Sequence, residues 1–253
     1  MAYKIYLSPA AHATDNKTKC VPECGENVHA NLYMDLVEKR LKECGFSVKR
    51  GSKKLTGSAA MTARVREANK WGADLYYVAH TNAGGGRYSV TYCYPNTGSK
   101  AIAATFGKFR KALESYNGYK WRCKTNKALY EINSTAAPCL YDELFFHDNA
   151  ADCAWFHDGG MEELAEEAVA GICAIFGVAY KPDEPVEYKP GKKLALNNAD
   201  VYRTATWGTP IKKTGTYYVY SDGQKNGRIP ITNKARGAGK KPSSLYIIGW
   251  IEV

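Results

Sequence analysis

The 253-residue sequence has no long apolar run and no leader-like beginning. No segment approaches the roughly 20 uninterrupted apolar residues that a membrane-spanning helix needs. The opening stretch MAYKIYLSP lacks the basic, apolar and small-residue regions of a secretory signal peptide. We therefore expect no membrane insertion, and we expect synthesis as a soluble protein of the cytoplasm.

Closely spaced cysteine pairs are also scarce. The eight cysteines are scattered through the first two-thirds of the chain, several at apolar positions, which predicts reduced thiols in the core. Only Cys20 and Cys24 are close enough to suggest a metal clip or a disulfide, and no second such pair follows. A zinc site of four thiolates is therefore not expected, and we interpret this segment as a loop.

Acidic residues are rare at the C-terminal end. From Lys189 to Val253, twelve Lys and Arg stand against three Asp and Glu, so this segment carries +9 of the formal net charge of +10. A small basic module attached to a neutral domain favours an anionic polymer as partner, such as nucleic acid, an anionic surface or a wall polymer.

A proline-rich segment divides the chain. Residues 179–193, AYKPDEPVEYKPGKK, contain three prolines and several charges, which interrupt any periodic pattern and predict a semi-rigid linker. We therefore predict one domain over residues 1–180, a linker over 181–192 and a second module over 193–253.

Strand and helix patterns alternate before the linker, which predicts an α/β domain with a mainly parallel, twisted sheet flanked by helices. Strands are expected over 3–9, 46–50, 73–80 and 88–95, with further short strands up to Phe146. Helices are expected over 58–71, 99–116 and 161–176, and a first helix ending at Gly45 has apolar residues at helical spacing, namely Val28, Leu32, Leu36, Val37 and Leu41. After the linker, short runs rich in Tyr and Ile predict a small all-β module.

Two histidines stand where predicted strands end. His12 follows the first strand in YLSPAAHATDN, and His80 ends the third in YYVAHTNA. The loops at the carboxyl ends of parallel strands form the ligand crevice of an open α/β sheet. A single histidine at a strand end is usually a surface or hydrogen-bonded structural residue, but two at equivalent ends favour a binding site.

A carboxylate is expected at the same edge of the sheet. Glu26 stands at the start of the first helix, where its alternative role is to stabilise the helix N-terminus through the helix dipole. Two His and one Glu with an open fourth position match the ligands of catalytic zinc sites, so we predict Zn²⁺ bound by His12, Glu26 and His80. His29, three residues after Glu26 on the same helical face, is the alternative ligand.

Amide hydrolysis by a zinc-bound water also needs a group that moves protons. Glu143, in APCLYDELFFHDN, lies between apolar strand residues, and burial there would raise its pKa towards the useful range. Asp142 is the competing choice, but adjacent strand residues face opposite sides, so only one of the two can face the metal. We expect His147 and His157 at the surface or in loops, with His147 near enough in sequence to Glu143 to contact substrate.

Taken together, these residues resemble the zinc-dependent N-acetylmuramoyl-L-alanine amidases of the type 3 group, which occur as bacterial cell-wall amidases and phage endolysins. The resemblance covers residues 1–178 and rests on His12, on Glu26 lying 19 positions before Gly45, on AHTNA around His80 and on PCLYDELFFHDNAAD. It implies the same three zinc ligands and Glu143 as the catalytic carboxylate. It also implies that the glycines after His80 leave space for a glycan-peptide substrate.

The sequence departs from the pattern of this group at two points. Many members have PGHGG around the first histidine, where this chain has SPAAHAT. The asparagine that usually follows the ligand Glu by four residues appears as Asn31, five residues later. The first of these differences concerns the geometry of the His12 loop.

The basic C-terminal segment resembles bacterial SH3-like cell-wall-binding modules in its order of turn and strand signals. Five aromatic side chains there are candidates for stacking on sugars, namely Trp207, Tyr217, Tyr218, Tyr220 and Trp250. The alternative is that some of them fill a small barrel, and for Trp250 we favour the core.

The leading hypothesis is a modular peptidoglycan amidase, a phage or prophage endolysin made in the cytoplasm, released by a route such as a holin and acting on the host cell wall. Its partner would be peptidoglycan or an associated wall polymer, and not nucleic acid. A zinc carboxypeptidase or related amidohydrolase is the second hypothesis, although no Arg stands out to pair with a terminal carboxylate. A non-enzymatic binder of anionic polymers, using the basic segment, is the third.

Overall fold

The chain divides into two units, Met1–Asp183 and Glu184–Val253. The computed structural model describes residues 2–20, 25–182, 188–205, 209–223, 225, 227–241 and 243–252. Cys24 and Trp207, both singled out in the sequence, lie outside the described residues. No helix within these ranges is long and apolar enough to cross a bilayer.

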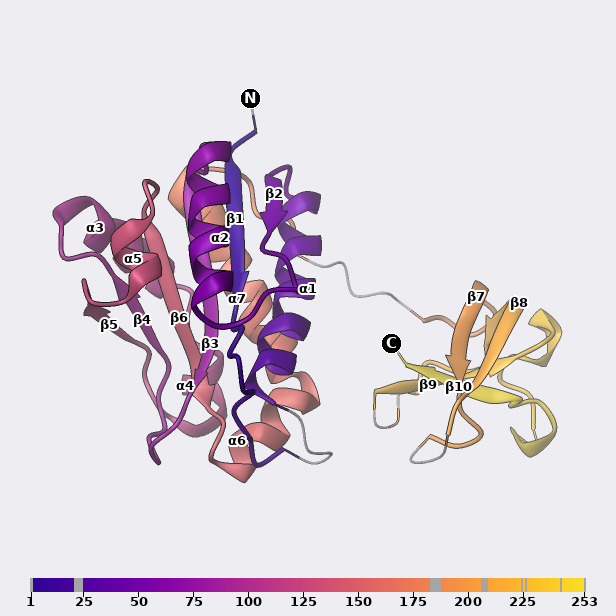
Figure 1. Cartoon of the computed structure of the whole chain (residues 1–253). Helices are drawn as coiled ribbons and strands as arrows, with labels where there is room; N and C mark the ends of the chain where they lie inside the picture. The colour runs from indigo at the N-terminus through magenta and orange to yellow at the C-terminus, as the bar shows by residue number, and fades with distance from the viewer. Residues whose placement is uncertain are drawn as a thin grey trace. The chain divides into compact units, whose positions relative to one another are not determined.

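A six-stranded sheet forms the centre of the first unit, in the order β2-β1-β3-β6-β4-β5 (Figure 1). Neighbouring strands are parallel except β4 and β6, which are antiparallel. The predicted α/β class with a mainly parallel sheet is therefore confirmed. The strands are β1 (Lys4–Pro9), β2 (Ser47–Arg50), β3 (Leu75–Asn82), β4 (Val90–Cys93), β5 (Arg122–Thr125) and β6 (Cys139–Phe146).

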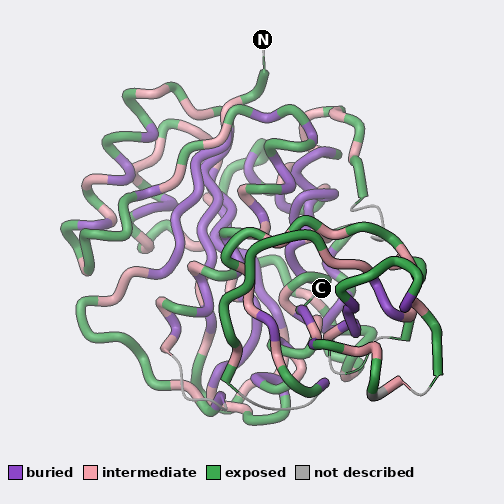
Figure 2. The backbone as a smooth tube through the Cα atoms, turned by 90° about the vertical axis from the view of Figure 1, so that its right-hand side faces the viewer, coloured by how far each residue is buried: buried purple, intermediate pink, exposed green. Residues whose placement is uncertain are grey.

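Helices cover both faces of this sheet because successive strand side chains point to opposite sides. Leu7 and Tyr77 belong to the core beneath α1 (Glu26–Glu43), α3 (Thr97–Gly107) and α7 (Met161–Phe176). Their neighbours Tyr6 and Tyr76 belong to the core on the other face, beneath α2 (Gly57–Trp71) and α5 (Tyr130–Ser134). Figure 2 shows the central strands buried along most of their length. The shorter segments are α4 (Ala112–Asn117), α6 (Ala150–Trp155) and the kinked segment η1 (Phe156–Gly160) between α6 and α7.

The prediction of a single helix over residues 99–116 is wrong, because the structure has two helices there, α3 and α4. At the end of α3 the backbone of Gly107 approaches the Trp121 ring so closely that a Cβ would lie 2.1 Å from a ring atom. The chain then leaves the helix and turns Arg110 into the core, where its side chain is 1% exposed and lies 2.8 Å from Asp142. The buried ion pair therefore accounts for a break that the helical pattern does not reveal.

The buried side of α1 also differs from the predicted one. Val28 and Leu32, expected in the core, are 45% and 41% exposed. His29 and Tyr33 are fully buried instead. Polar contacts of the first turn with the sheet edge, described below, fix this rotation of the helix.

The second unit is an antiparallel β structure. Tyr202, which follows β7, and Trp250 of β10 exchange backbone hydrogen bonds of 2.8 and 2.9 Å, which join the two edges of the sheet. Five apolar residues fill its centre: Val201, Val219, Ile229, Ile231 and Ile251. Its elements are β7 (Lys193–Val201), β8 (Ile211–Val219), β9 (Arg228–Thr232), β10 (Gly249–Glu252), η2 (Ala235–Gly237) and η3 (Ser243–Leu245), and the sheet order is β10-β9-β8-β7.

One of the five aromatic side chains that we considered for sugar stacking, Tyr220, is buried and therefore cannot stack on a sugar. Tyr220 is 5% exposed, and its hydroxyl donates a hydrogen bond to the Lys240 carbonyl. Tyr217, Tyr218 and Trp250 are partly buried and keep some exposed surface. A buried ring cannot present a face to a sugar, so Tyr220 belongs to the core of this unit.

Candidate metal centre and active site

The loop that carries His12 is tied to the start of α1. The His12 N–H donates to Asn27 Oδ1 at 2.8 Å, and Asn27 Nδ2 donates back to the His12 carbonyl at 3.0 Å. The Asn27 N–H in turn donates to Asp15 at 2.8 Å, which places a carboxylate at the helix N-terminus, where the helix dipole favours it. These contacts hold His12 beside Glu26, the first residue of α1.

Glu26 is almost completely buried, with 2% of its surface exposed, and its carboxylate receives four contacts. Asn16 Nδ2 and the Thr81 N–H donate to it at 2.6 and 3.1 Å. His80 Nδ1 lies 2.9 Å from Oε1, and His12 Nε2 lies 3.1 Å from Oε2. Burial alone would raise the pKa of Glu26, but the contacts with both histidines outweigh it and hold that pKa well below the usual range.

His80 lies near the end of β3, facing the α2 side of the sheet. Its ring stacks on Tyr141 of β6 with centroids 4.9 Å apart, which fixes the ring plane. The His12 ring meets it edge-on at 5.2 Å. One ligand atom from each of His12, Glu26 and His80 lies within 4.8 Å of the other two, so the structure brings the three predicted ligands together.

These three residues fit a metal ion. The His12 Nε2 atom is shielded from solvent and lacks hydrogen-bond geometry to any partner, although it lies 3.1 Å from a Glu26 oxygen. A buried polar atom without a hydrogen bond is costly unless something else satisfies it. Two imidazole nitrogens and a carboxylate are a donor set that suits zinc and similar transition metals.

Glu143 stands next to this group. In the parallel pair of β3 and β6 its Cα partner is His80, so both side chains lie on the same face of the sheet. Its Oε2 atom is buried without a hydrogen-bond partner. Burial raises the pKa of Glu143 to about 7, helped by Glu26 and opposed by His80. A carboxyl group with such a pKa can both accept and donate a proton near neutral pH.

Asp142, the competing carboxylate, faces the opposite side of the sheet. It is fully buried and accepts hydrogen bonds from the Tyr77 hydroxyl at 2.9 Å and the Thr91 hydroxyl at 2.8 Å. It also pairs with Arg110 at 2.8 Å. Asp142 therefore stabilises the core beneath α1, α3 and α7 and does not face His80.

The remaining three histidines lie outside the His12, Glu26 and His80 group. His147 lies in the turn after β6, which agrees with the expected loop position, but it is only 4% exposed, and its Nδ1 lies 2.8 Å from the Thr81 hydroxyl. His29, the alternative ligand, contacts Cys20 and His157 instead. Burial lowers the pKa of His29 to about 4.

The glycines after His80 have a structural use. The N–H groups of Gly84 and Gly85 both donate to Asp148, at 2.9 and 2.8 Å. Gly86 approaches the Phe146 ring so closely that a Cβ would lie 2.2 Å from it. These contacts hold the loop against the end of β6. The Phe146 ring fills the space beside Gly86, whereas no atom lies within 4 Å of a Cβ built at Gly84 or Gly85, so the expected space is found beside these two glycines only.

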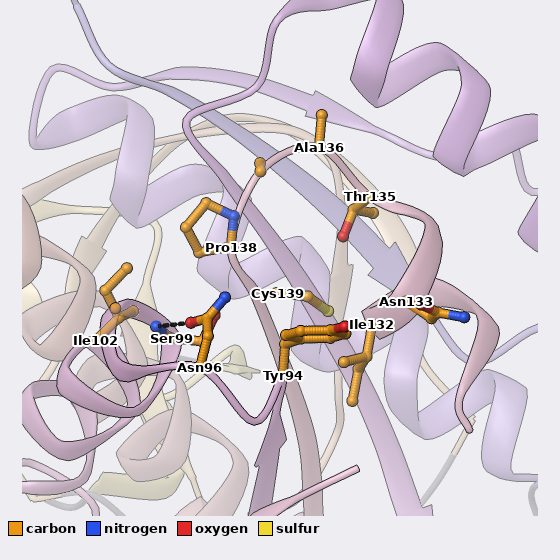
Figure 3. A pocket seen from close by; sticks show the side chains of 12 residues that line it. Tyr94, Asn96, Ser99, Ile102, Ile132, Asn133, Thr135, Ala136, Pro138 and Cys139 are labelled. Carbon is orange, nitrogen blue, oxygen red and sulfur yellow. Dashed lines mark hydrogen bonds between the residues drawn. The ribbon is translucent and has the colours of Figure 1, made fainter. Parts of the chain in front are cut away.

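A small pocket lies beside the three candidate metal ligands, His12, Glu26 and His80. Its volume is about 180 Å³, and its lining includes His12, His80, Met61 and Tyr141. A larger pocket of about 340 Å³ opens between the end of β4, α3 and α5 (Figure 3). That pocket lies at the first residue of β6, Cys139, which is four residues and therefore about 13 Å along the strand from Glu143. His12 and His80 line the smaller pocket, and none of the three candidate ligands lines the larger one.

Sequence reasoning missed the residues that orient the ligands. Asn16, Asn27 and Thr81 hold Glu26 and His12 through hydrogen bonds. An asparagine near a helix start predicts only a cap, and nothing in the sequence predicts that Asn16 folds back onto Glu26. Only the folded loop between β1 and α1 reveals these contacts.

Two proteins of known function are similar to parts of this chain. An N-acetylmuramoyl-L-alanine amidase, CwlM, of Bacillus licheniformis is 32% identical over 123 residues, which is 48% of this chain and 48% of that protein. The endolysin of Bacillus phage SPP1 is 28% identical over 169 residues, which is 59% of this chain and 62% of the endolysin. The chain thus spans about half to three-fifths of the length of these relatives.

The fold and the family follow from two further comparisons. The catalytic domain of CwlV, an N-acetylmuramoyl-L-alanine amidase from Bacillus (Paenibacillus) polymyxa var. colistinus, superposes with a TM-score of 0.61 at 18% identity. That match covers 71% of this chain and 100% of the domain, and at this identity it shows a shared fold. A family model for N-acetylmuramoyl-L-alanine amidases matches residues 10–174, well over half of the chain and all of the site described above. The chain therefore belongs to the N-acetylmuramoyl-L-alanine amidase family Amidase_3.

Proposed function

We propose that the first unit hydrolyses the amide bond between N-acetylmuramic acid and L-alanine in bacterial peptidoglycan. The observation that carries this proposal is the convergence of His12, Glu26 and His80 on one point, with Glu143 beside His80 on the same face of the sheet. Membership of the amidase family supports the bond that is cleaved. The alternative in which Asp142 moves the proton is opposed by its burial on the other face.

Zn²⁺ held by His12, Glu26 and His80 would polarise the scissile carbonyl and acidify a water molecule. Glu143 then accepts the proton of the attacking water and delivers it to the nitrogen of the leaving L-alanine. Burial raises the pKa of Glu143 in the metal-free protein, and this burial favours a carboxyl group that can both accept and donate a proton near neutral pH.

The neighbouring residues orient these groups. Asn16 and the Thr81 N–H hold the Glu26 carboxylate in one position. Tyr141 supports the His80 ring, and Asn27 supports the His12 backbone. Fixed ligand geometry matters because partners of this kind strengthen both metal binding and catalysis.

For the second unit we propose an SH3-like module that binds peptidoglycan or an associated wall polymer. Its antiparallel sheet with joined edges is consistent with a small barrel. The excess of basic residues after Lys189 would attract an anionic wall polymer. Similarity to the SPP1 endolysin supports action on the bacterial wall as a phage or prophage lysin.

The function is tested by measuring lysis of purified walls by the untagged protein. Removal of metal with a chelator should abolish activity, and added Zn²⁺ should restore it. Glu143→Gln should keep its zinc and lose activity by about 10² or more, as expected for loss of general acid and base catalysis. Glu114→Gln, which changes an exposed carboxylate in α4, is the matched control and should behave as the wild type. Activity that survives chelation, or a fully active Glu143→Gln protein, would contradict the proposal.

A further inference from the structure

A second group of metal-ligating side chains lies at the first turn of α1. We propose that Cys20, His29 and His157 form a second Zn²⁺ site, separate from His12, Glu26 and His80, that fixes the start of α1. One ligand atom from each of these residues lies within 4.8 Å of the other two. The first group contains no sulfur, so the two sites would differ in their donor atoms.

The interatomic distances fit coordination of a shared ion. The Nε2 atoms of His29 and His157 lie 3.1 Å apart, and Cys20 Sγ lies 3.2 Å from the same His29 nitrogen. Ligands about 2.3 Å (sulfur) and 2.0–2.1 Å (nitrogen) from a tetrahedral zinc are about 3.3–3.6 Å apart, close to these values. One imidazole N–H can donate to only one of two acceptors along its axis, so hydrogen bonding accounts less well for two neighbours of His29 Nε2.

Three segments that are distant in sequence meet at this point. Cys20 comes from the loop after β1, and His29 comes from the first turn of α1. His157 comes from η1, where Asp158 and Gly159 leave helical geometry and Gly159 has φ 103°. A metal ion here would tie the loop, the helix and the turn together.

The surroundings of His29 favour a structural ion. Cys20 is 4% exposed and His29 is fully buried, and the rings of Phe145 and Phe156 lie 5.9 and 5.4 Å from the imidazole. A Cys20 thiolate buried beside these rings needs a nearby positive charge, and a Zn²⁺ ion would supply it. Thiolate and imidazole together select zinc over magnesium or calcium. The sequence holds a further thiol, Cys24, four residues after Cys20, but it lies outside the described residues and the proposal rests on the other three.

The position of this site links it to the first one. Glu26 and His29 are three residues apart in the first turn of α1, about 4.5 Å along the helix axis. Fixing His29 therefore fixes the turn that presents Glu26 to His12 and His80. The Cys20 segment, interpreted from the sequence as a loop, would then be the anchor of that turn.

The test is metal content and cobalt spectroscopy on untagged, fully reduced protein. Elemental analysis of the wild type should find about two zinc ions per chain, and the Cys20→Ser/His157→Ala protein should hold about one. In the Co²⁺-substituted wild type, the thiolate should produce an intense near-ultraviolet charge-transfer band, which nitrogen and oxygen ligands do not produce. The double variant should lose that band.

Three further variants make the result specific. His12→Ala removes a ligand of the first group, and it should keep the charge-transfer band and one zinc. Cys123→Ser removes an exposed thiol of β5 and should leave both readouts as in the wild type. His157→Ala, whose ring is exposed, should weaken the band even if the double variant fails to fold. A wild-type protein with one zinc and no charge-transfer band would overturn the second site, whatever its activity on walls.

Discussion

Neighbouring carboxylates in β6 show how side-chain direction decides the role of a residue. Glu143 lies beside His80 and its carboxyl group has no hydrogen-bond partner at Oε2, whereas Asp142 is held by Tyr77, Thr91 and Arg110 on the other face. The sequence predicts that the two point to opposite sides, because strand residues alternate. It does not reveal Arg110 as a partner, since that contact forms only where the chain breaks between α3 and α4.

At the residue scale, Glu143 predicts a pH dependence of stability in the metal-free protein. Its pKa of about 7 lies above the ordinary 4.5, so the folded state keeps this proton while the unfolded chain loses it. The stability contributed by the neutral group is complete below about pH 4.5 and is lost as the pH rises through about 7. Glu143→Gln should therefore raise the melting temperature of metal-free protein relative to wild type more at about pH 8 than at about pH 5.

This prediction is checked by thermal denaturation of both chelated proteins at the two pH values, with Glu114→Gln as the control. An equal difference between Glu143→Gln and wild type at both pH values would mean that the Glu143 carboxyl group is not held neutral by burial.

At the scale of elements, α1 is the part of the fold on which the site depends most. Its first turn carries Glu26, Asn27 and His29, which face the His12 loop and the Cys20 group. The sequence predicts this helix, and it predicts that the helix begins at the sheet edge that carries His12 and His80. The predicted buried side of α1 is wrong at Val28 and Leu32, which follow helical spacing but are exposed. The polar contacts of Glu26 and His29 decide how the helix is rotated about its axis.

Asn27→Ala should weaken metal binding at the first site without unfolding the domain. The side chain makes both hydrogen bonds that hold the His12 backbone, and loss of such supporting contacts lowers metal affinity by about 10–100-fold. Competition with a chromogenic zinc chelator would measure the change. Asn133→Ala, at an exposed position of α5, is the control and should keep wild-type affinity. Unchanged affinity in Asn27→Ala would show that the His12 loop holds its shape by other contacts.

At the scale of the whole molecule, the chain divides into two units where the pattern of helix and strand signals changes in the sequence. The prolines between residues 179 and 193 and the shift from alternating helices and strands to short β runs both indicate it. The all-β class of the second unit was therefore predictable. The ligand of this unit was not, because the aromatic set mixes a core residue, Tyr220, with partly exposed rings.

A protein ending at residue 182 should fold, bind metal and cleave soluble wall fragments at the rate of the full chain, because every proposed site residue lies in the first unit. Its lysis of intact walls should be slower, because it lacks the second unit that we propose raises local enzyme concentration at the wall. Parallel rate measurements on both substrates check this. A truncated protein that lyses intact walls as fast as the full chain would contradict a wall-binding role for the second unit.

Mass spectrometry of digested peptidoglycan identifies the bond that the protein cuts. Walls would be incubated with the zinc-loaded full chain or with Glu143→Gln, and the soluble products identified. We predict stem peptides with a free L-alanine amino group and glycan strands that keep the lactyl group of N-acetylmuramic acid, with neither product above background in Glu143→Gln. Cleavage within the glycan strand or within the stem peptide, with the bond between N-acetylmuramic acid and L-alanine left intact, would contradict it.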